Sequence, residues 1–245
     1  MHTFSNGLRL IKGNTNKIPW TVILLFFWIS ACQESSTTPI DSYRYFPLEL
    51  GSFIVYDVKQ DVFAAGNSEP VTSAWQEKDQ IESSTSNVDN VTDFIVSKYR
   101  RNSETDYWQK FDEYSIKSSP DKILTTIDNQ TVFSFTFPVE SYVKWNGNTY
   151  NSLDVENCHY ENIDESVSFS GHLFENTVKV VERMDSSVIN KHVGVKQYAL
   201  GVGLVFDEQI SFEYCQTEQC LSSDIREIES GYHIVKTFNS VGKNN

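Results

Sequence analysis

Residues 131–137 read TVFSFTF, and this stretch indicates the fold most clearly. Phenylalanine occupies every second position, and two of the residues between are small hydroxyl side chains. Successive side chains of a β-strand point to opposite faces of the sheet, so this spacing predicts a strand. We therefore expect the three phenylalanines to be buried together, with Ser134 and Thr136 on the opposite face.

The same alternation recurs along the rest of the chain. It is clearest at 54–58, 174–180, 204–212 and 232–238, and further strands are expected near 71–82, 93–101, 107–116, 122–127, 157–169 and 191–198. Turn-forming residues separate these runs, among them Asn146-Gly147, which predicts a hairpin turn. About ten short strands with frequent turns predict an all-β fold, a single antiparallel β domain built as a sandwich, a roll or an incompletely closed barrel.

The N-terminal segment predicts export. Residues 1–17 are polar and basic, and residues 18–31 read IPWTVILLFFWISA, an apolar run of fourteen. A membrane-spanning helix needs about 20 apolar residues, whereas a shorter run behind a basic segment and ending in small residues is typical of a secretory signal peptide. A buried core helix is the alternative, but the run has no polar face.

Residues 29–32 read ISAC and resemble the bacterial lipobox, in which an aliphatic residue and two small residues precede the cysteine that receives lipid. The resemblance implies cleavage before Cys32 and acylation of Cys32 by chains such as palmitate. Stable anchoring takes two or more chains, each contributing about 0.8 kcal/mol per buried CH₂. We therefore divide the chain into a lipoprotein signal peptide (1–31), a lipidated tether (32–41), the antiparallel β domain (42–240) and a frayed tail (241–245).

The charge of the chain argues against a nucleic-acid partner. There are 20 Lys and Arg against 33 Asp and Glu, a net charge of −13. The signal segment contains Arg9, Lys12 and Lys17 and no acid, so 17 basic residues remain against 33 acidic ones, a net charge of −16. Phosphate binding requires a basic face, so we expect no nucleic-acid partner. The expected partner is a membrane, reached through the lipid at Cys32.

Three blocks resemble a family of uncharacterised Bacteroidota lipoproteins. They are YFPLELGSFIVY at 45–56, FPV at 137–139 followed by WNGN at 145–148, and GVGLV at 201–205 followed by a C-x4-C pair and ESGY at 229–232. The resemblance implies a lipid-anchored β domain at the outer membrane of the cell envelope, on its periplasmic or its surface face. It brings no catalytic residues with it.

Four cysteines are present, and Cys32 is assigned to lipid. Cys215 and Cys220 lie in a polar segment, and export places them in an oxidising compartment, so we expect a disulfide between them. Cys158 is then left as a buried free thiol. A zinc site that combines these three cysteines with His159 is the alternative, but it needs reduced thiolates, and adjacent strand residues point to opposite faces. We expect no metal and no cofactor.

No catalytic motif is present: the chain lacks G-x-S-x-G, H-E-x-x-H, a P-loop and an EF-hand loop. An acidic run comprises Asp154, Glu156, Glu161, Asp164 and Glu165. A glycosidase needs two converging carboxylates, and the sequence does not establish convergence. A solvated acidic edge is the simpler interpretation.

Tryptophan side chains are the remaining candidates for a binding site. Trp75, Trp108 and Trp145 lie among polar neighbours, and aromatic faces on a β-surface suit sugar rings or peptides. Packing in the core is the alternative. We expect a non-enzymatic, lipid-anchored envelope domain that binds a ligand such as a glycan, or an envelope protein. The alternatives are an envelope carbohydrate-active enzyme with dispersed carboxylates and a purely structural envelope component.

Overall fold

A computed structural model describes residues 41–67, 69–87, 89–222 and 226–244. The expected signal peptide, the lipidation site Cys32 and the tether as far as residue 40 lie outside the described residues. Within the described part of the chain, no helix is long and apolar enough to cross a membrane.

Strands make up most of the described chain. They are β1 (Ser52–Phe63), β2 (Val71–Ser86), β3 (Thr92–Arg101), β4 (Gln109–Ser119), β5 (Lys122–Ile127), β6 (Gln130–Thr136), β7 (Lys144–Asn146), β8 (Asn157–Phe169), β9 (His172–Ser186), β10 (Asn190–Ala199), β11 (Gly203–Tyr214) and β12 (Ile228–Lys243). A 3-10 helix, η2 (Ser42–Tyr45), precedes the sheet, and a four-residue helix, α2 (Glu218–Leu221), lies between β11 and β12. Because β12 continues to Lys243, most of the expected frayed tail belongs to a strand.

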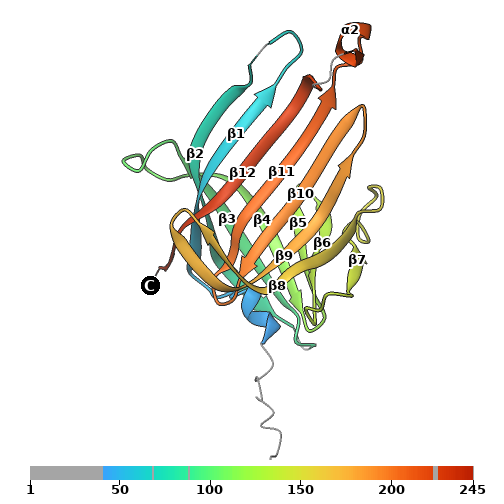
Figure 1. Cartoon of the computed structure of the whole chain (residues 1–245). Coiled ribbons are helices and arrows are strands. Elements are labelled where there is room, and N and C mark those ends of the chain that lie inside the picture. Colours follow the sequence, from blue (N-terminus) through green and yellow to red (C-terminus); the bar gives the residue numbers. More distant parts are fainter. Residues whose placement is uncertain (1–40, 68, 88, 223–225, 245) are drawn as a thin grey trace, which may run out of the picture. The chain divides into compact units, whose positions relative to one another are not determined.

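All twelve strands form one antiparallel sheet, and each pairs with the strand that precedes or follows it in the chain, except at one place (Figure 1). The sheet runs from β6 back to β1, crosses to β12 and continues back to β7. This arrangement confirms the all-β prediction and, among its variants, fits the incompletely closed barrel. Twelve strands are present where about ten were expected. The sequence pattern does not indicate β7, because three residues are too few to display an alternation.

β6 carries the quoted alternation with one irregularity. Phe135 is fully buried, and Phe133 and Phe137 pack against the same core, as expected. A β-bulge lies where β6 pairs with β5, and Ser134 is the extra residue. Ser134, which we expect on the face opposite the phenylalanines, is buried and lines an internal cavity.

The barrel is open between β6 and β7, which form no ladder with each other in the described structure. One backbone hydrogen bond, from the N–H of Phe133 to the carbonyl oxygen of Gly147 at 2.8 Å, bridges the opening together with side chains. The indole N–H of Trp145 donates to the carbonyl oxygen of Phe133 at 2.7 Å. The hydroxyl of Tyr160 accepts from the backbone N–H of Thr136 at 2.9 Å and donates to the carbonyl oxygen of the same residue at 2.6 Å. Buried backbone groups that lack a ladder are thus still paired.

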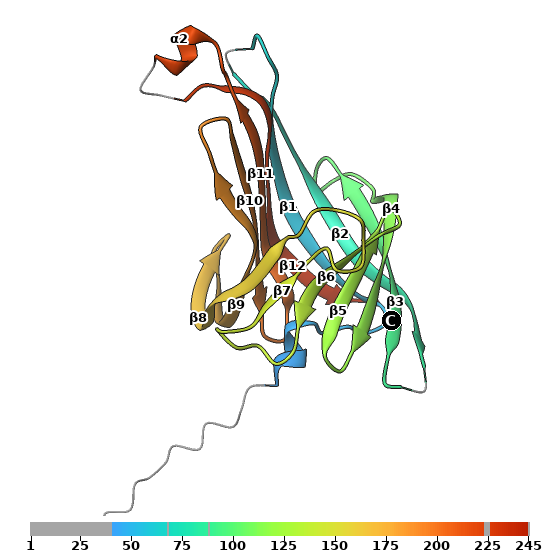
Figure 2. The ribbon, with the colours of Figure 1, turned by 90° about the vertical axis from the view of Figure 1, so that its right-hand side faces the viewer.

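Two apolar clusters stabilise the domain. The larger one lies inside the barrel, where the ring of Phe135 is 5.1 Å from that of Tyr160 and 5.3 Å from that of Tyr198. The smaller one lies where the tip of the β8–β9 hairpin folds across β11 and β12, on the side away from β3–β6 (Figures 1 and 2). There the rings of Phe174 and Phe238 are 5.2 Å apart. Both faces of the sheet are therefore covered in this region.

Two local predictions are wrong. Gly147 does not have a positive φ, so Asn146-Gly147 is not the expected hairpin turn. Instead β7 ends at Asn146, whose side-chain oxygen accepts hydrogen bonds from the backbone N–H groups of Asn148 and Glu156, at 3.0 and 2.9 Å. This asparagine organises a longer loop. The strand expected near 71–82 is also longer than predicted, because β2 continues to Ser86.

Candidate ligand-binding cavities

The barrel encloses a cavity of about 420 Å³ on the side of the sheet that faces the larger apolar cluster. Strand alternation turns apolar side chains from several strands into it. Its apolar wall includes Phe46, Leu48, Ile81, Val96, Ile116 and Leu204. Glu49 and Lys243 are the exposed, paired residues of this lining, with Lys243 Nζ 2.9 Å from Glu49 Oε2, and they mark its opening to solvent.

One end of this cavity is charged. Lys196 on β10 pairs in register with Asp207 on β11, and Asp207 pairs in turn with Lys236 on β12. Residues paired across antiparallel strands share a face of the sheet, so these three side chains form a row along the inner wall. We call Lys196, Asp207 and Lys236 the charged row.

Glu77 on β2 is 2% exposed and is the carboxylate partner of Lys236 in this row. It accepts a hydrogen bond from Lys236 and lies 3.9 Å from Lys98 Nζ and 3.2 Å from Arg100 Nη2. Burial acts to raise the pKa of Glu77, but the neighbouring cations, chiefly Lys236, outweigh it and lower the pKa to about 2. Glu77 is therefore ionised at neutral pH.

Two further carboxyl groups in the cavity wall have the opposite shift. Burial raises the pKa of Asp79 above its ordinary value, although Lys236 and Lys98 oppose the change. Its Oδ2 accepts from the hydroxyl of Tyr114 at 3.1 Å, whereas Oδ1 is buried with no hydrogen-bond partner among the described residues. Burial likewise raises the pKa of Asp207, against the influence of Lys196. Desolvation disfavours the charged form of both groups.

A second cavity, of about 630 Å³, adjoins the first. The two share Val132, Lys196 and Asp207 as wall residues, so the charged row lies at their boundary. Hydrogen-bonding side chains are frequent in the second wall, including Asn148, Asp154, Glu156, Glu182, His192 and Gln209. We call the first the lower cavity and the second the upper cavity.

The three candidate tryptophans do not converge on one surface. Trp145 is buried in the larger apolar cluster, with its ring 4.9 Å from that of Tyr160. For this tryptophan, the alternative of packing in the core is therefore the correct one. Trp75 donates its indole N–H to Glu77 at 2.8 Å and stacks on Arg100. Trp108 is half-buried before β4 and stacks on Arg101. Arg101 follows Arg100 on β3, so its side chain points to the other face of that strand. None of the three lines either cavity.

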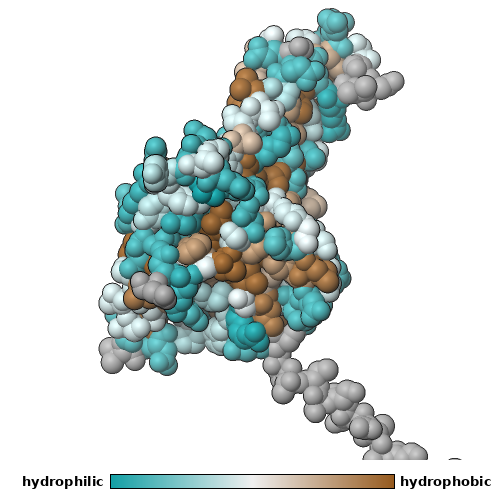
Figure 3. Space-filling model, turned by 90° about the vertical axis from the view of Figure 1, so that its left-hand side faces the viewer, coloured by the Kyte–Doolittle hydropathy of each residue, from teal (hydrophilic) through white to brown (hydrophobic). Residues whose placement is uncertain are grey.

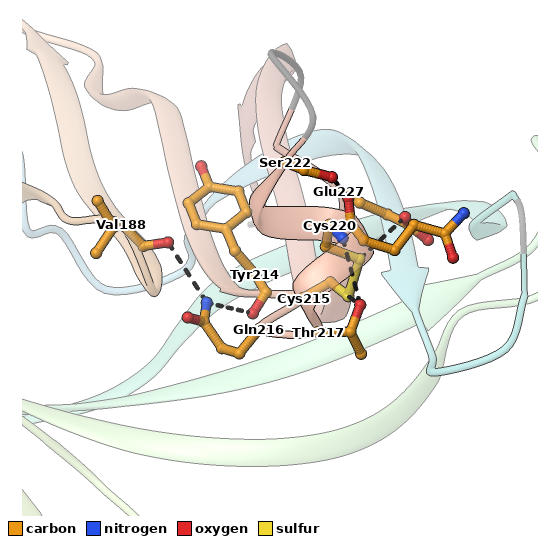
Figure 4. The surroundings of a disulfide bond; sticks show 9 residues. Val188, Tyr214, Cys215, Gln216, Thr217, Cys220, Ser222 and Glu227 are labelled. Atoms are coloured by element: carbon orange, nitrogen blue, oxygen red, sulfur yellow. Dashed lines mark hydrogen bonds between the residues drawn. A yellow bond between two sulfur atoms is a disulfide. The ribbon is translucent and has the colours of Figure 1, made fainter.

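The predicted disulfide between Cys215 and Cys220 is present, with Cα atoms 5.8 Å apart (Figure 4). Thr217 caps α2 between them, since its hydroxyl accepts the backbone N–H of Cys220 at 3.3 Å. The carboxylate of Glu227 lies close to both sulfurs. Sulfurs joined to each other offer no thiolate, so this group is not a metal site.

Cys158 is a buried free thiol, as expected. It lies on β8 opposite Trp145, and its side chain reaches the wall of the upper cavity. Burial is the main reason why its pKa is raised to about 12. A protonated thiol is a poor nucleophile and a poor metal ligand. The structure places it apart from the disulfide, so the alternative of a shared zinc site is not supported.

The acidic run between 154 and 165 does not form one site. Asp154 and Glu156 line the upper cavity, where Glu156 pairs with Arg183. Glu161 instead bonds Lys179 Nζ at 2.8 Å on the neighbouring strand, outside both cavities. Some residues of the acidic run therefore line the upper cavity, and at least one lies outside both cavities.

Sequence reasoning did not single out the charged row. A signal for it exists in the alternation, because Lys196 is two positions from the buried Tyr198, and Asp79 is two positions from the buried Ile81. A charged side chain in phase with buried neighbours must be paired or solvated inside the fold. Searches of protein-family models, of curated proteins and of solved structures found no match to this chain.

Proposed function

We propose that this chain is a lipid-anchored cell-envelope protein whose β barrel binds a small amphipathic molecule in its lower cavity. The observation that carries the proposal is the character of that cavity, which passes from an apolar wall to the charged row. Ligand pockets of about 300–1,000 Å³ with apolar walls and a few polar groups are the usual form of small-molecule sites. A volume of about 420 Å³ falls within this range.

The location of the protein belongs to the same proposal. The lipobox-like residues 29–32 and the preceding apolar run support acylation of Cys32 and attachment to the outer membrane, on its periplasmic or surface face. The net charge of −16 after the signal segment supports a partner other than nucleic acid. Exposed apolar side chains are most frequent in the lower half of the face shown in Figure 3, where polar residues adjoin them, and an envelope protein docking there is the alternative partner.

Titration with the apolar fluorophore N-phenyl-1-naphthylamine, followed by methyl NMR, tests the binding proposal. We expect saturable binding of one molecule per chain, with shifts of the Val96 and Ile116 methyl signals, because both residues line the lower cavity. Val167, which packs in the smaller cluster, is the internal control and should not shift. Shifts confined to Val167 and its neighbours, or no saturable binding, would contradict the proposal.

An envelope carbohydrate-active enzyme is the second candidate function, and one observation favours it. Asp79 and Asp207 line the same cavity and both have a raised pKa, which is a frequent property of catalytic acids. An enzyme of this kind should hydrolyse at least one nitrophenyl glycoside, and Asp79→Asn or Asp207→Asn should abolish turnover. Turnover that survives both substitutions would remove these carboxyl groups from the mechanism.

A further inference from the structure

The boundary between the two cavities divides the barrel by chemistry. On one side of the charged row the wall is largely apolar, with Ile81, Val96 and Ile116 among its residues. On the other side the upper cavity is rich in oxygen acceptors. Val132 on β6 lies in both walls, so it faces the row across the interior. A molecule that occupied both cavities would pass between Val132 and the row.

The charges of the upper cavity limit what its occupant carries. Its wall contains the carboxylates of Asp154, Glu156 and Glu182, and the carboxyl group of Asp207, against two permanent cations, Arg183 and Lys196. These cations are already engaged, because Arg183 pairs with Glu156 and Lys196 with Glu182. An anionic group entering here would meet an excess of negative charge, and like charges at close range repel.

The uncharged polar groups of the upper cavity limit the occupant further. Gln209 Nε2 already donates to Glu182 and Asp207, so Gln209 offers an acceptor oxygen. Asn148 donates one amide hydrogen to the carbonyl oxygen of Asp154 and offers the other, and the hydroxyl of Ser211, which lies 3.2 Å from His192 Nδ1, can donate or accept. Groups that donate and accept at once match hydroxyls, which do the same. An ammonium group donates only, so it cannot accept the second amide hydrogen of Asn148 or the hydroxyl hydrogen of Ser211.

We infer that the ligand is an uncharged amphiphile, with an apolar chain in the lower cavity and a hydroxyl-rich, sugar-like head in the upper cavity. This inference rests on the proposed function and names its ligand class. The charged row then lies beside the junction of chain and head, where Lys196 and Asp207 face polar atoms rather than the chain.

Calorimetric titration of the whole chain with four probes of equal chain length tests the inference. They are octyl glucoside, octanoate and octylammonium, each kept below its micelle concentration, and octanol, kept below its solubility limit. One or two net hydrogen bonds to the sugar should make octyl glucoside bind about tenfold tighter than octanol. Octanoate should bind more weakly than octanol. Equal affinities for octyl glucoside and octanol, or tighter binding of octanoate or octylammonium, would overturn the inference.

Two histidine variants locate the head group. His192 lines the upper cavity, whereas His233 pairs with Glu208 at 2.8 Å and lines neither cavity. His192→Leu should remove most of the advantage of octyl glucoside over octanol, and His233→Leu should retain it. Retention in both variants would place the sugar elsewhere. Because octanol and the fluorophore need only the lower cavity, their failure to bind would contradict the proposed function itself, whereas their binding without any sugar preference would contradict only this inference.

Discussion

The indole Nε1 of Trp145 lies 2.7 Å from the carbonyl oxygen of Phe133, and this hydrogen bond joins β7 to β6. These are the consecutive strands that the described structure leaves without a ladder. The barrel is therefore closed there by side chains and by one backbone hydrogen bond, from Phe133 to Gly147, with Tyr160 bonding both backbone groups of Thr136 in the same gap. We call this junction between β6 and β7 the seam. Because individual side chains hold it, single substitutions there should lower the stability of the domain.

Tyr160→Phe should destabilise the domain markedly. The substitution keeps the ring, which packs in the larger apolar cluster, and removes only the hydroxyl. The N–H and carbonyl of Thr136 then lose their partner, which costs about 1–3 kcal/mol for each buried group left unpaired. A urea melt measures the change. Tyr107→Phe is the control, because Tyr107 is 92% exposed, and its midpoint should not move. Equal midpoints for the two variants would contradict the role of the seam.

Thiol counting tests the cysteine assignments. In a chain with Cys32→Ser, Cys158 should react very slowly with a disulfide reagent, because burial raises its pKa to about 12. Unfolding in urea without reductant should expose one reactive thiol, and added reductant should expose two more. Three thiols without reductant would contradict the disulfide between Cys215 and Cys220, and fast labelling of the folded chain would contradict the burial of Cys158.

Glu77→Gln should weaken the domain in a pH-dependent way. The pKa of Glu77 is lowered from 4.5 to about 2 in the folded chain, so its contribution is fully present above 4.5 and is lost as the pH falls toward 2. Removing one partner of a buried ion pair costs about 3–5 kcal/mol at neutral pH. Urea midpoints of wild type and variant should therefore differ strongly near neutral pH and converge in acid.

The matched control for Glu77 is Glu113→Gln on β4. Glu113 pairs with Lys110 at 2.6 Å, but its side chain is 49% exposed. A surface pair contributes little because water screens it. The urea midpoint of Glu113→Gln should therefore stay close to that of wild type at every pH. A difference for Glu77→Gln that does not narrow in acid would show that the loss arises from packing rather than from charge.

Cys32→Ser should abolish lipid labelling. An alkyne-bearing palmitate fed to the producing cells should mark the wild-type chain, because the thiol at position 32 is the proposed acceptor. Cys158→Ser, which removes a buried thiol, is the control and should retain the label. Label that persists on the Cys32→Ser chain, or membrane attachment that is unchanged, would contradict the proposed anchor.

The sequence predicts the sheet well where alternation is long. In β9, Val178 and Val180 are fully buried and Glu175 is exposed, as their spacing indicates, although Thr177 on the alternate position is fully buried as well. The bulge at Ser134 was not predicted, because no residue type at 131–137 indicates one. The strand β7 was not predicted, because its three residues are too few to show an alternation.

The candidate site was predicted far less well than the fold. The aromatic side chains that drew attention, Trp75, Trp108 and Trp145, lie outside both cavities. The charged row depends on three strands meeting in register, from β10 to β12, and single-sequence patterns do not give register between strands. The local conflict of Lys196 with the buried residues beside it was the available signal, and such conflicts concentrate at functional sites.

Binding of N-phenyl-1-naphthylamine to Ile116→Trp tests the central claim most directly. Ile116 lines the lower cavity, and an indole there fills space that the ligand needs. Overpacking costs about 1–3 kcal/mol, so circular dichroism must first show that the variant is folded. Val71→Trp is the control, since Val71 is 61% exposed on β2 and lies outside both cavities. The account predicts that Val71→Trp binds the fluorophore like wild type and that folded Ile116→Trp does not. Wild-type affinity in Ile116→Trp would contradict it.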